Sequence, residues 1–194
     1  ETNVLETIHS LEDFKKLKTS ELVSLAAEIR KFLLKTVSQT GGHLASNLGV
    51  VELTIAVHRV FSSPTDQIVF DVGHQSYVHK IITGRRDQLF TLRSENGLSG
   101  FPKRAESVHD AFDTGHAGTS ISAALGMARA KALMGQPGRA VAIIGDGALG
   151  NGLPFEALND AGQSKTPVIV VLNDNGMSIS RNVGAMNGHL NKIR

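Results

Sequence analysis

Two groups of polar residues hold the chemistry that is easiest to see in this sequence. Asp146 stands between two glycines, and Asn173, Asp174 and Asn175 form a second group that ends 29 positions later. Carboxylate and amide oxygens are ligands that Mg²⁺ accepts, and the ion usually keeps other positions for phosphate oxygens and water. The sequence therefore predicts a site for Mg²⁺ and a phosphate group where these residues converge.

Each group follows a short apolar run that is typical of a buried strand. The runs are AVAII at 140–144 and PVIVVL at 167–172, and neither alternates between apolar and polar residues. Between them, Phe155, Leu158 and Ala161 recur at helical spacing. This strand–helix–strand unit predicts an α/β fold with a mostly parallel sheet and helices on both faces. In such sheets ligands bind beyond the carboxyl ends of the strands.

Three Gly-His pairs give further candidates, because each precedes a predicted helix. Their histidines are His43, His74 and His116. His74 stands at the carboxyl end of the predicted strand 67–71, as Asp146 does at the end of its own, so several glycine-opened turns could surround one site. Functional side chains concentrate in loops. Local chemistry alone leaves a functional and a structural role for His43 equally open.

Other polar residues have less specific surroundings. The candidate N-caps of the predicted helices are Ser20, Asn47 and either Thr119 or Ser120. His58 and His79 fall within predicted helices; we expect a structural or surface role for His58 and a place on the surface face of the helix for His79. For most of the basic residues between 85 and 104, Arg85 among them, we expect a solvated surface; attraction of an anionic substrate is the alternative.

The glycines around Asp146 allow a competing interpretation. Gly145, Gly147 and Gly150 spell G-x-G-x-x-G between a strand and a helix, which is the pattern of an NAD-binding loop. However, the Asp146 carboxylate would repel a pyrophosphate unless a cation lay between them. The next strand also ends in an amide-rich triplet, not in the acidic residue that binds a ribose. The metal interpretation is therefore preferred, and an ordinary pair of tight turns is the structural alternative.

Composition excludes several classes of protein. The chain has 194 residues, a formal charge of +2 and no cysteine, which argues against nucleic-acid binding and excludes disulfides and thiolate metal sites. No apolar run is long enough for a membrane helix, and the start has no signal-peptide pattern. We expect a cytoplasmic protein without a membrane or nucleic-acid partner.

Five segments in order are similar to the 1-deoxy-D-xylulose-5-phosphate synthase family. They are TGGHLASNLGVVELTIA, FDVGHQSYVHKIITGR, GLSGFPKR, DTGHAGTSISAALGMA and VLNDNGMSISRNVGA. The spacing of G-D-G and N-D-N also resembles the thiamine diphosphate motif that this family shares with transketolase. The resemblance implies the diphosphate-type domain of the thiamine diphosphate-binding fold.

The resemblance also implies roles for individual residues. Mg²⁺ would be bound by Asp146, the Asn175 side chain and the main-chain carbonyl of Met177. The residues that would hold the cofactor, Asn175 again among them, are His74, Gly115, His116, Ala117, Gly147 and Ala148. His43 matches an active-site histidine that orients substrate and moves protons, and His74 is a second catalytic candidate. Ala117 replaces a residue that carries a hydroxyl in the family's common pattern.

The implied reaction is the condensation of pyruvate with D-glyceraldehyde 3-phosphate to 1-deoxy-D-xylulose 5-phosphate with loss of CO₂, which feeds isoprenoid and thiamine biosynthesis. We expect residues 1–19 to form an arm and short helix, and 20–194 a diphosphate- and Mg²⁺-binding domain truncated at its C-terminal end. We also expect this chain to lack the family's pyrimidine-binding and C-terminal domains, and the resemblance implies a homodimer. The alternatives are transketolase-like ketol transfer, an NAD-binding domain and a non-catalytic module.

Overall fold

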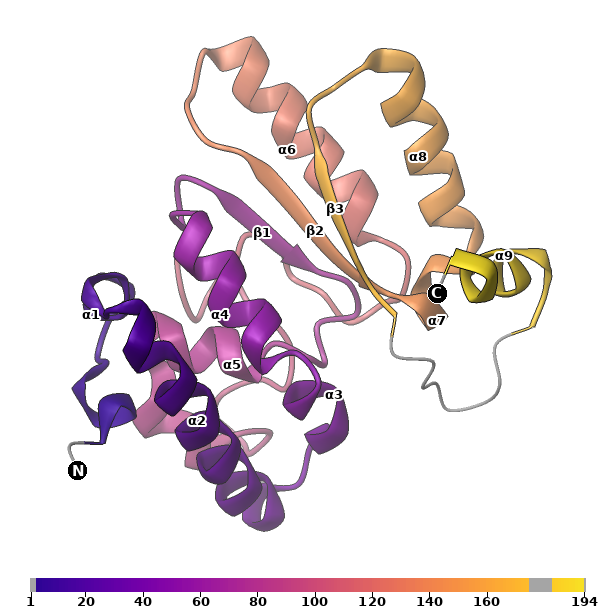
Figure 1. Ribbon diagram of the computed structural model, residues 1–194. Coiled ribbons are helices and arrows are strands. Elements are labelled where there is room, and N and C mark those ends of the chain that lie inside the picture. The colour runs from indigo at the N-terminus through magenta and orange to yellow at the C-terminus, as the bar shows by residue number, and fades with distance from the viewer. Residues whose placement is uncertain (1–2, 175–182, 194) are drawn as a thin grey trace.

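Three parallel strands lie at the centre of the computed structural model, which describes residues 3–174 and 183–193 (Figure 1). They are β1 (Gln67–Phe70), β2 (Ala140–Gly145) and β3 (Ile169–Asn173), and they are arranged in the order β1-β2-β3. Gln67 is paired with Ala140 at one end of the sheet, and Gly145 with Asn173 at the other. The three predicted strands are confirmed, and their carboxyl ends lie along one edge.

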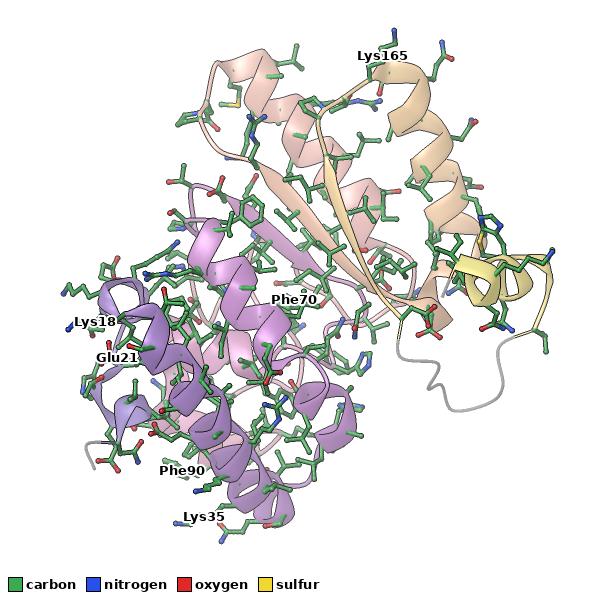
Figure 2. The ribbon with its side chains drawn as sticks, viewed as in Figure 1. Lys18, Glu21, Lys35, Phe70, Phe90 and Lys165 are labelled. Atoms are coloured by element: carbon green, nitrogen blue, oxygen red, sulfur yellow. The ribbon has the colours of Figure 1, made fainter. Side chains whose placement is uncertain are left out.

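Helices cover both faces of this sheet, as the apolar runs predict (Figure 1). On one face, Val57 of α4 (Val51–Val60) packs against Phe70, which Figure 2 labels, and against Val141 and Ile143. On the other face, the sheet packs against α6 (Ser120–Met134) and α8 (Gly152–Ser164). Because both faces are covered, the strands read as continuous apolar runs.

Helix α8 turns a different face to the sheet from the one that its periodicity predicts. Its buried residues are Pro154 and Ala157, whereas Phe155 and Leu158 are each 39% exposed. Ala157 packs in the same core as Ala124 and Ala128 of α6, and these small side chains let the two helices approach closely. The face of α8 that is buried within this chain is therefore its small-residue face.

A second core lies beside the sheet and is built from Val51 and Ile55 of α4 together with helices from the N-terminal half of the chain (Figure 1). Its elements are η1 (Val4–Thr7), α1 (Leu11–Lys16), α2 (Thr19–Thr40), α3 (Leu44–Leu48), α5 (Tyr77–Lys80), η2 (Ile81–Arg85) and η3 (Arg86–Thr91). Leu11 and Phe14 of α1 are buried in it, which confirms the short N-terminal helix. Two short elements complete the described chain: α7 (Asp146–Leu149) and α9 (Ala185–Ile193).

The start of α2 corrects one predicted cap. The helix begins at Thr19, so Ser20 lies inside it. The Glu21 carboxylate instead accepts a hydrogen bond of 2.7 Å from the backbone N–H of Lys18; both residues are labelled in Figure 2. The helix ends at Gly41, where φ is +73°, as the Gly41-Gly42 pair predicts.

Across the described residues, no helix combines the length and the apolar character that crossing a membrane requires.

Candidate active site

The carboxyl edge of the sheet carries an aspartate after each strand. Asp71 follows β1, Asp146 follows β2, and Asp174 lies one residue beyond β3. Since Gly145 and Asn173 are register partners, Asp146 and Asp174 each follow a paired residue. The predicted convergence is thereby confirmed for Asp146 and the first two residues of the Asn-Asp-Asn group. Asn175 and Met177, the other predicted metal ligands, lie outside the described residues.

A cleft beside Asp146 lies at this edge of the sheet. Helix α7 begins at Asp146, and a cavity of about 430 Å³ is lined by Asp146, Gly147, Gly150, Asn151 and residues of the segment 183–190. The Asn151 side chain donates a 2.9 Å hydrogen bond to the carbonyl of Ala148, which closes the turn after α7. In the described ranges 3–174 and 183–193, no three His, Asp or Glu side chains gather as a metal-binding cluster.

The turn at 115–118 lies against the segment that follows α7. A Cβ added at Gly118 would lie 3.1 Å from Cδ of Pro154 and 3.5 Å from Cβ of Asn151. Gly118, the last residue of this turn, therefore lies against the segment that follows α7, and the cofactor contacts expected for Gly115, His116 and Ala117 stay predictions. The His116 ring lies at the surface, with its Nδ1 2.9 Å from the carbonyl oxygen of Ala117.

The Asp71 side chain binds the turn at 115–118 and so holds it against the end of β1. Sequence reasoning missed this role. The buried carboxylate of Asp71 accepts hydrogen bonds from the backbone N–H groups of Gly118 at 2.8 Å and Ser120 at 3.0 Å. Thr119 occupies the N-cap position of α6, yet its side chain makes no capping bond. The predicted local cap is thus replaced by a carboxylate 49 residues earlier in the chain. A charged residue directly after a buried strand was the available signal.

His43 and His74 lie together in a second part of the edge. Their rings meet edge to face with centroids 5.4 Å apart. The buried phenol of Tyr77 accepts a 3.2 Å hydrogen bond from the His43 backbone N–H, and its oxygen lies 3.5 Å from Nδ1 of His43. The structure therefore brings together two of the three predicted histidines.

Burial lowers the pKa of both histidines below the ordinary value of histidine. For His43 the nearby positive charge of Arg93 adds to the effect, and for His74 the neighbouring His43 does. Both imidazoles are consequently more often neutral at pH 7 and able to accept a proton. The buried Nδ1 of His74 has no hydrogen-bond partner within the part of the chain that the structure describes.

Glycine is required at two positions, one in the turn that precedes His43 and one in the turn that precedes His74. Gly42 has φ of +131°, and a Cβ there would lie 2.7 Å from the Tyr77 hydroxyl oxygen. Gly73 has φ of +89°, and its Cβ would lie 2.1 Å from Oγ1 of Thr114. Any side chain at either position would be strained and would collide with a neighbour. These glycines let the turns that carry His43 and His74 approach the rest of the edge.

Asn47 is not the helix cap that the sequence predicts. It lies inside α3 and is fully buried, and α4 starts only at Val51. Its side chain bonds to the backbone of His43, His74 and Tyr77.

A buried polar chain supports the segments around the histidine turns. His79 Nε2 lies 2.8 Å from Asp110 Oδ1, and His79 Nδ1 lies 2.8 Å from Nε2 of His58. Because an ionised carboxylate only accepts hydrogen bonds, His79 donates from Nε2 and accepts at Nδ1, so His58 donates from its Nε2. Arg85 donates to both oxygens of Asp110 at 2.8 and 2.7 Å.

This chain corrects two predictions. His79 and Arg85 are buried partners of Asp110, not surface groups, while His58 has the structural role that we expected. Although burial alone would raise the pKa of Asp110, the hydrogen bonds from His79 and Arg85 hold it well below its usual range. Helical periodicity could not reveal these partners, because they come from distant parts of the chain.

Comparison with known proteins adds independent evidence. A family model described as 1-deoxy-D-xylulose-5-phosphate synthase matches residues 5–194. Curated proteins of that name are 63% identical over 190 residues in Alkaliphilus oremlandii and 57% identical over 192 residues in Clostridium acetobutylicum. The protein named 1-deoxy-D-xylulose-5-phosphate synthase 1 of Geobacter sulfurreducens is 61% identical over 191 residues. The matches cover 98–99% of this chain but only 30–31% of the length of those relatives.

Proposed function

The chain belongs to the 1-deoxy-D-xylulose-5-phosphate synthase family, and on this premise we propose that it forms the Mg²⁺- and diphosphate-binding part of a thiamine diphosphate-dependent transferase of the transketolase type. The observation that carries the proposal is the pairing of Gly145 with Asn173, because it puts Asp146 and Asp174 at neighbouring positions of the sheet edge.

The chemistry of the residues at this edge fits the proposed cofactor. A carboxylate on Asp146 is a hard oxygen ligand, and the cleft beside it is bordered by glycines that leave space for a diphosphate. We propose that Asp146, the Asn175 side chain and the Met177 carbonyl hold Mg²⁺. The proposed contacts of the cofactor are Asn175, His74, Gly115, His116, Ala117, Gly147 and Ala148. Thiamine diphosphate supplies carbanion chemistry when bound.

His43 and His74 would act beside that cofactor. We propose that His43 orients the substrate and accepts or returns a proton, and that His74 both contacts the diphosphate and assists this transfer. Their lowered pKa values support the assignment, because a neutral imidazole has a free nitrogen that can accept a proton near neutral pH. The edge-to-face contact holds the two rings in a defined orientation.

The substrates and the assembly follow from the family. We propose that the whole protein condenses pyruvate with D-glyceraldehyde 3-phosphate, in the pathways to isoprenoids and thiamine, and that it acts as a cytoplasmic homodimer. Residues 20–194 would be its diphosphate domain. Since this chain spans about 30% of its relatives, the remaining protein would supply the pyrimidine-binding half of the site and the groups that hold the substrate phosphate.

The proposal is tested on the full-length protein that contains this chain. Mass spectrometry should detect 1-deoxy-D-xylulose 5-phosphate from pyruvate and D-glyceraldehyde 3-phosphate, with dependence on thiamine diphosphate and Mg²⁺. Product only from a ketose phosphate donor and an aldose phosphate acceptor would contradict the substrate assignment. Calorimetry that shows NAD binding without Mg²⁺, and no binding of thiamine diphosphate with it, would contradict the cofactor assignment.

A further inference from the structure

The side chain of Asn47 joins three segments of the candidate site. Its Nδ2 donates hydrogen bonds to the carbonyl oxygens of His43 at 2.7 Å and His74 at 2.8 Å. Its Oδ1 accepts a 2.8 Å hydrogen bond from the backbone N–H of Tyr77. These partners come from the turn before α3, the turn after β1 and the start of α5, so one side chain connects the backbone on both sides of the histidine pair.

Asparagine has the right set of polar groups for this position. The site offers two carbonyl oxygens and one N–H group, which require two donors and one acceptor on a single short side chain. The Asn47 amide supplies both donors and the acceptor, and the residue is completely buried. Aspartate has the same shape, but when ionised it supplies no donor. Serine supplies one donor and does not reach the same three partners at once.

The connection fixes the separation of two histidines. The carbonyls that Asn47 binds belong to His43 and His74 themselves, and the N–H belongs to Tyr77, whose phenol in turn accepts the His43 backbone N–H. The rings that these two backbones carry lie 5.4 Å apart between centroids. Loss of the two Nδ2 bonds would remove a donor from each carbonyl oxygen and leave that of His43 with only the longer 3.3 Å side-chain bond from Ser46 Oγ.

We propose that Asn47 is a positioning residue that sets the placement of His43 relative to His74. Its effect on turnover rests on the proposed function, in which both histidines face the cofactor. Asn47 is completely buried and acts through the backbone groups that it binds. A displacement of about 1 Å in such groups can lower a rate on the order of 100-fold.

The test compares variants of the full-length protein. Asn47→Asp keeps the shape and the acceptor and removes both donors, and Asn47→Ser keeps one donor if the aspartate variant does not fold. Leu25→Ala is the matched control, because Leu25 is a fully buried residue of α2 in the same core and its apolar side chain gives no hydrogen bond to the histidine turns. Turnover is measured per site titrated with thiamine diphosphate and Mg²⁺, which removes any effect of partial unfolding.

We expect turnover per site to fall about 10- to 100-fold in Asn47→Asp, less in Asn47→Ser, and to stay within about twofold in Leu25→Ala. The imidazole NMR resonances of His43 and His74, recorded without cofactor, should shift in the Asn47 variants and not in Leu25→Ala. Unchanged resonances together with unchanged turnover per site in a folded Asn47 variant would overturn the proposal. Shifted resonances in a protein that binds no thiamine diphosphate would uphold the positioning role and overturn the proposed function instead.

Discussion

The carboxylate of Asp71 accepts a hydrogen bond from the backbone N–H of Ser120 at 3.0 Å, and it thereby joins the end of β1 to the first turn of α6. A second bond from Gly118 at 2.8 Å uses the other carboxylate oxygen. The cap of this helix is therefore a buried side chain from a strand, and the turn that carries His116 is held to the sheet by it.

Asp71→Asn should lower the free energy of unfolding by about 1–3 kcal/mol, because one of the two N–H groups then faces an amide nitrogen that cannot accept. Urea unfolding of the full-length protein measures the change. Asp160→Asn is the control, since Asp160 pairs with Arg129 at the surface, where water screens the charges, and should cost less. Equal losses in the two variants would contradict the capping role of Asp71.

Asp146→Ala should abolish Mg²⁺-dependent binding of thiamine diphosphate while the protein stays folded, because it removes the carboxylate proposed to hold the metal. Isothermal calorimetry measures the binding, and circular dichroism checks the fold. Glu156→Gln removes an exposed carboxylate from the nearby helix α8 and should leave binding as in the wild type. An unchanged affinity in Asp146→Ala would show that the metal assignment is wrong.

His43→Gln should reduce turnover about 100-fold and largely retain cofactor binding, because the group removed is one that orients substrate and transfers a proton. Steady-state kinetics and calorimetry separate the two effects. A variant that lost cofactor affinity but kept its turnover at saturating cofactor would place His43 in binding alone.

The stability of the protein should fall as the pH is lowered from 7 to 5. Burial lowers the pKa of five histidines in the folded state: His43, His58, His74, His79 and His109. Below the ordinary value of about 6.5, the unfolded chain therefore binds more protons than the folded one, so acid favours unfolding. Their contribution is fully present above that value and is lost progressively below it.

Urea unfolding at several pH values measures this dependence. His58→Phe should make it shallower, because the pKa of His58 is lowered well below its ordinary value and phenylalanine does not titrate. A free energy of unfolding that is flat between pH 7 and pH 5 in the wild type would contradict the prediction.

The local sequence was sufficient to predict features whose pattern lies within a single strand, helix or turn. The continuous apolar runs gave the three strands, since residues buried on both faces lose their alternation. The ends of these strands located Asp146 and Asp174 at one edge, because parallel strands in register bring their carboxyl ends together. The glycine pair at 41–42 marked the end of α2 for the same local reason: glycine readily adopts positive φ.

Predictions failed where a polar group's partner is distant in the chain. Ser20, Asn47 and Thr119 are reasonable caps by local rules. A glutamate binds the start of α2 and the carboxylate of Asp71 caps α6, while Asn47 joins two turns and caps no helix. His79 and Arg85 were expected at the surface, but Asp110 compensates for their burial. A buried polar group must find a hydrogen bond, and nothing in the local pattern identifies its donor or acceptor.

The sequence by itself therefore determined the parallel α/β sheet, the aspartates and histidines at its edge and the resemblance to one family. Only the tertiary structure decided how these groups are held: Asp71 on the start of α6, Asn47 between His43 and His74, and Asp110 between His79 and Arg85. The physical reason is that periodicity and turn chemistry act over a few residues, whereas buried hydrogen bonds connect segments that folding alone brings together.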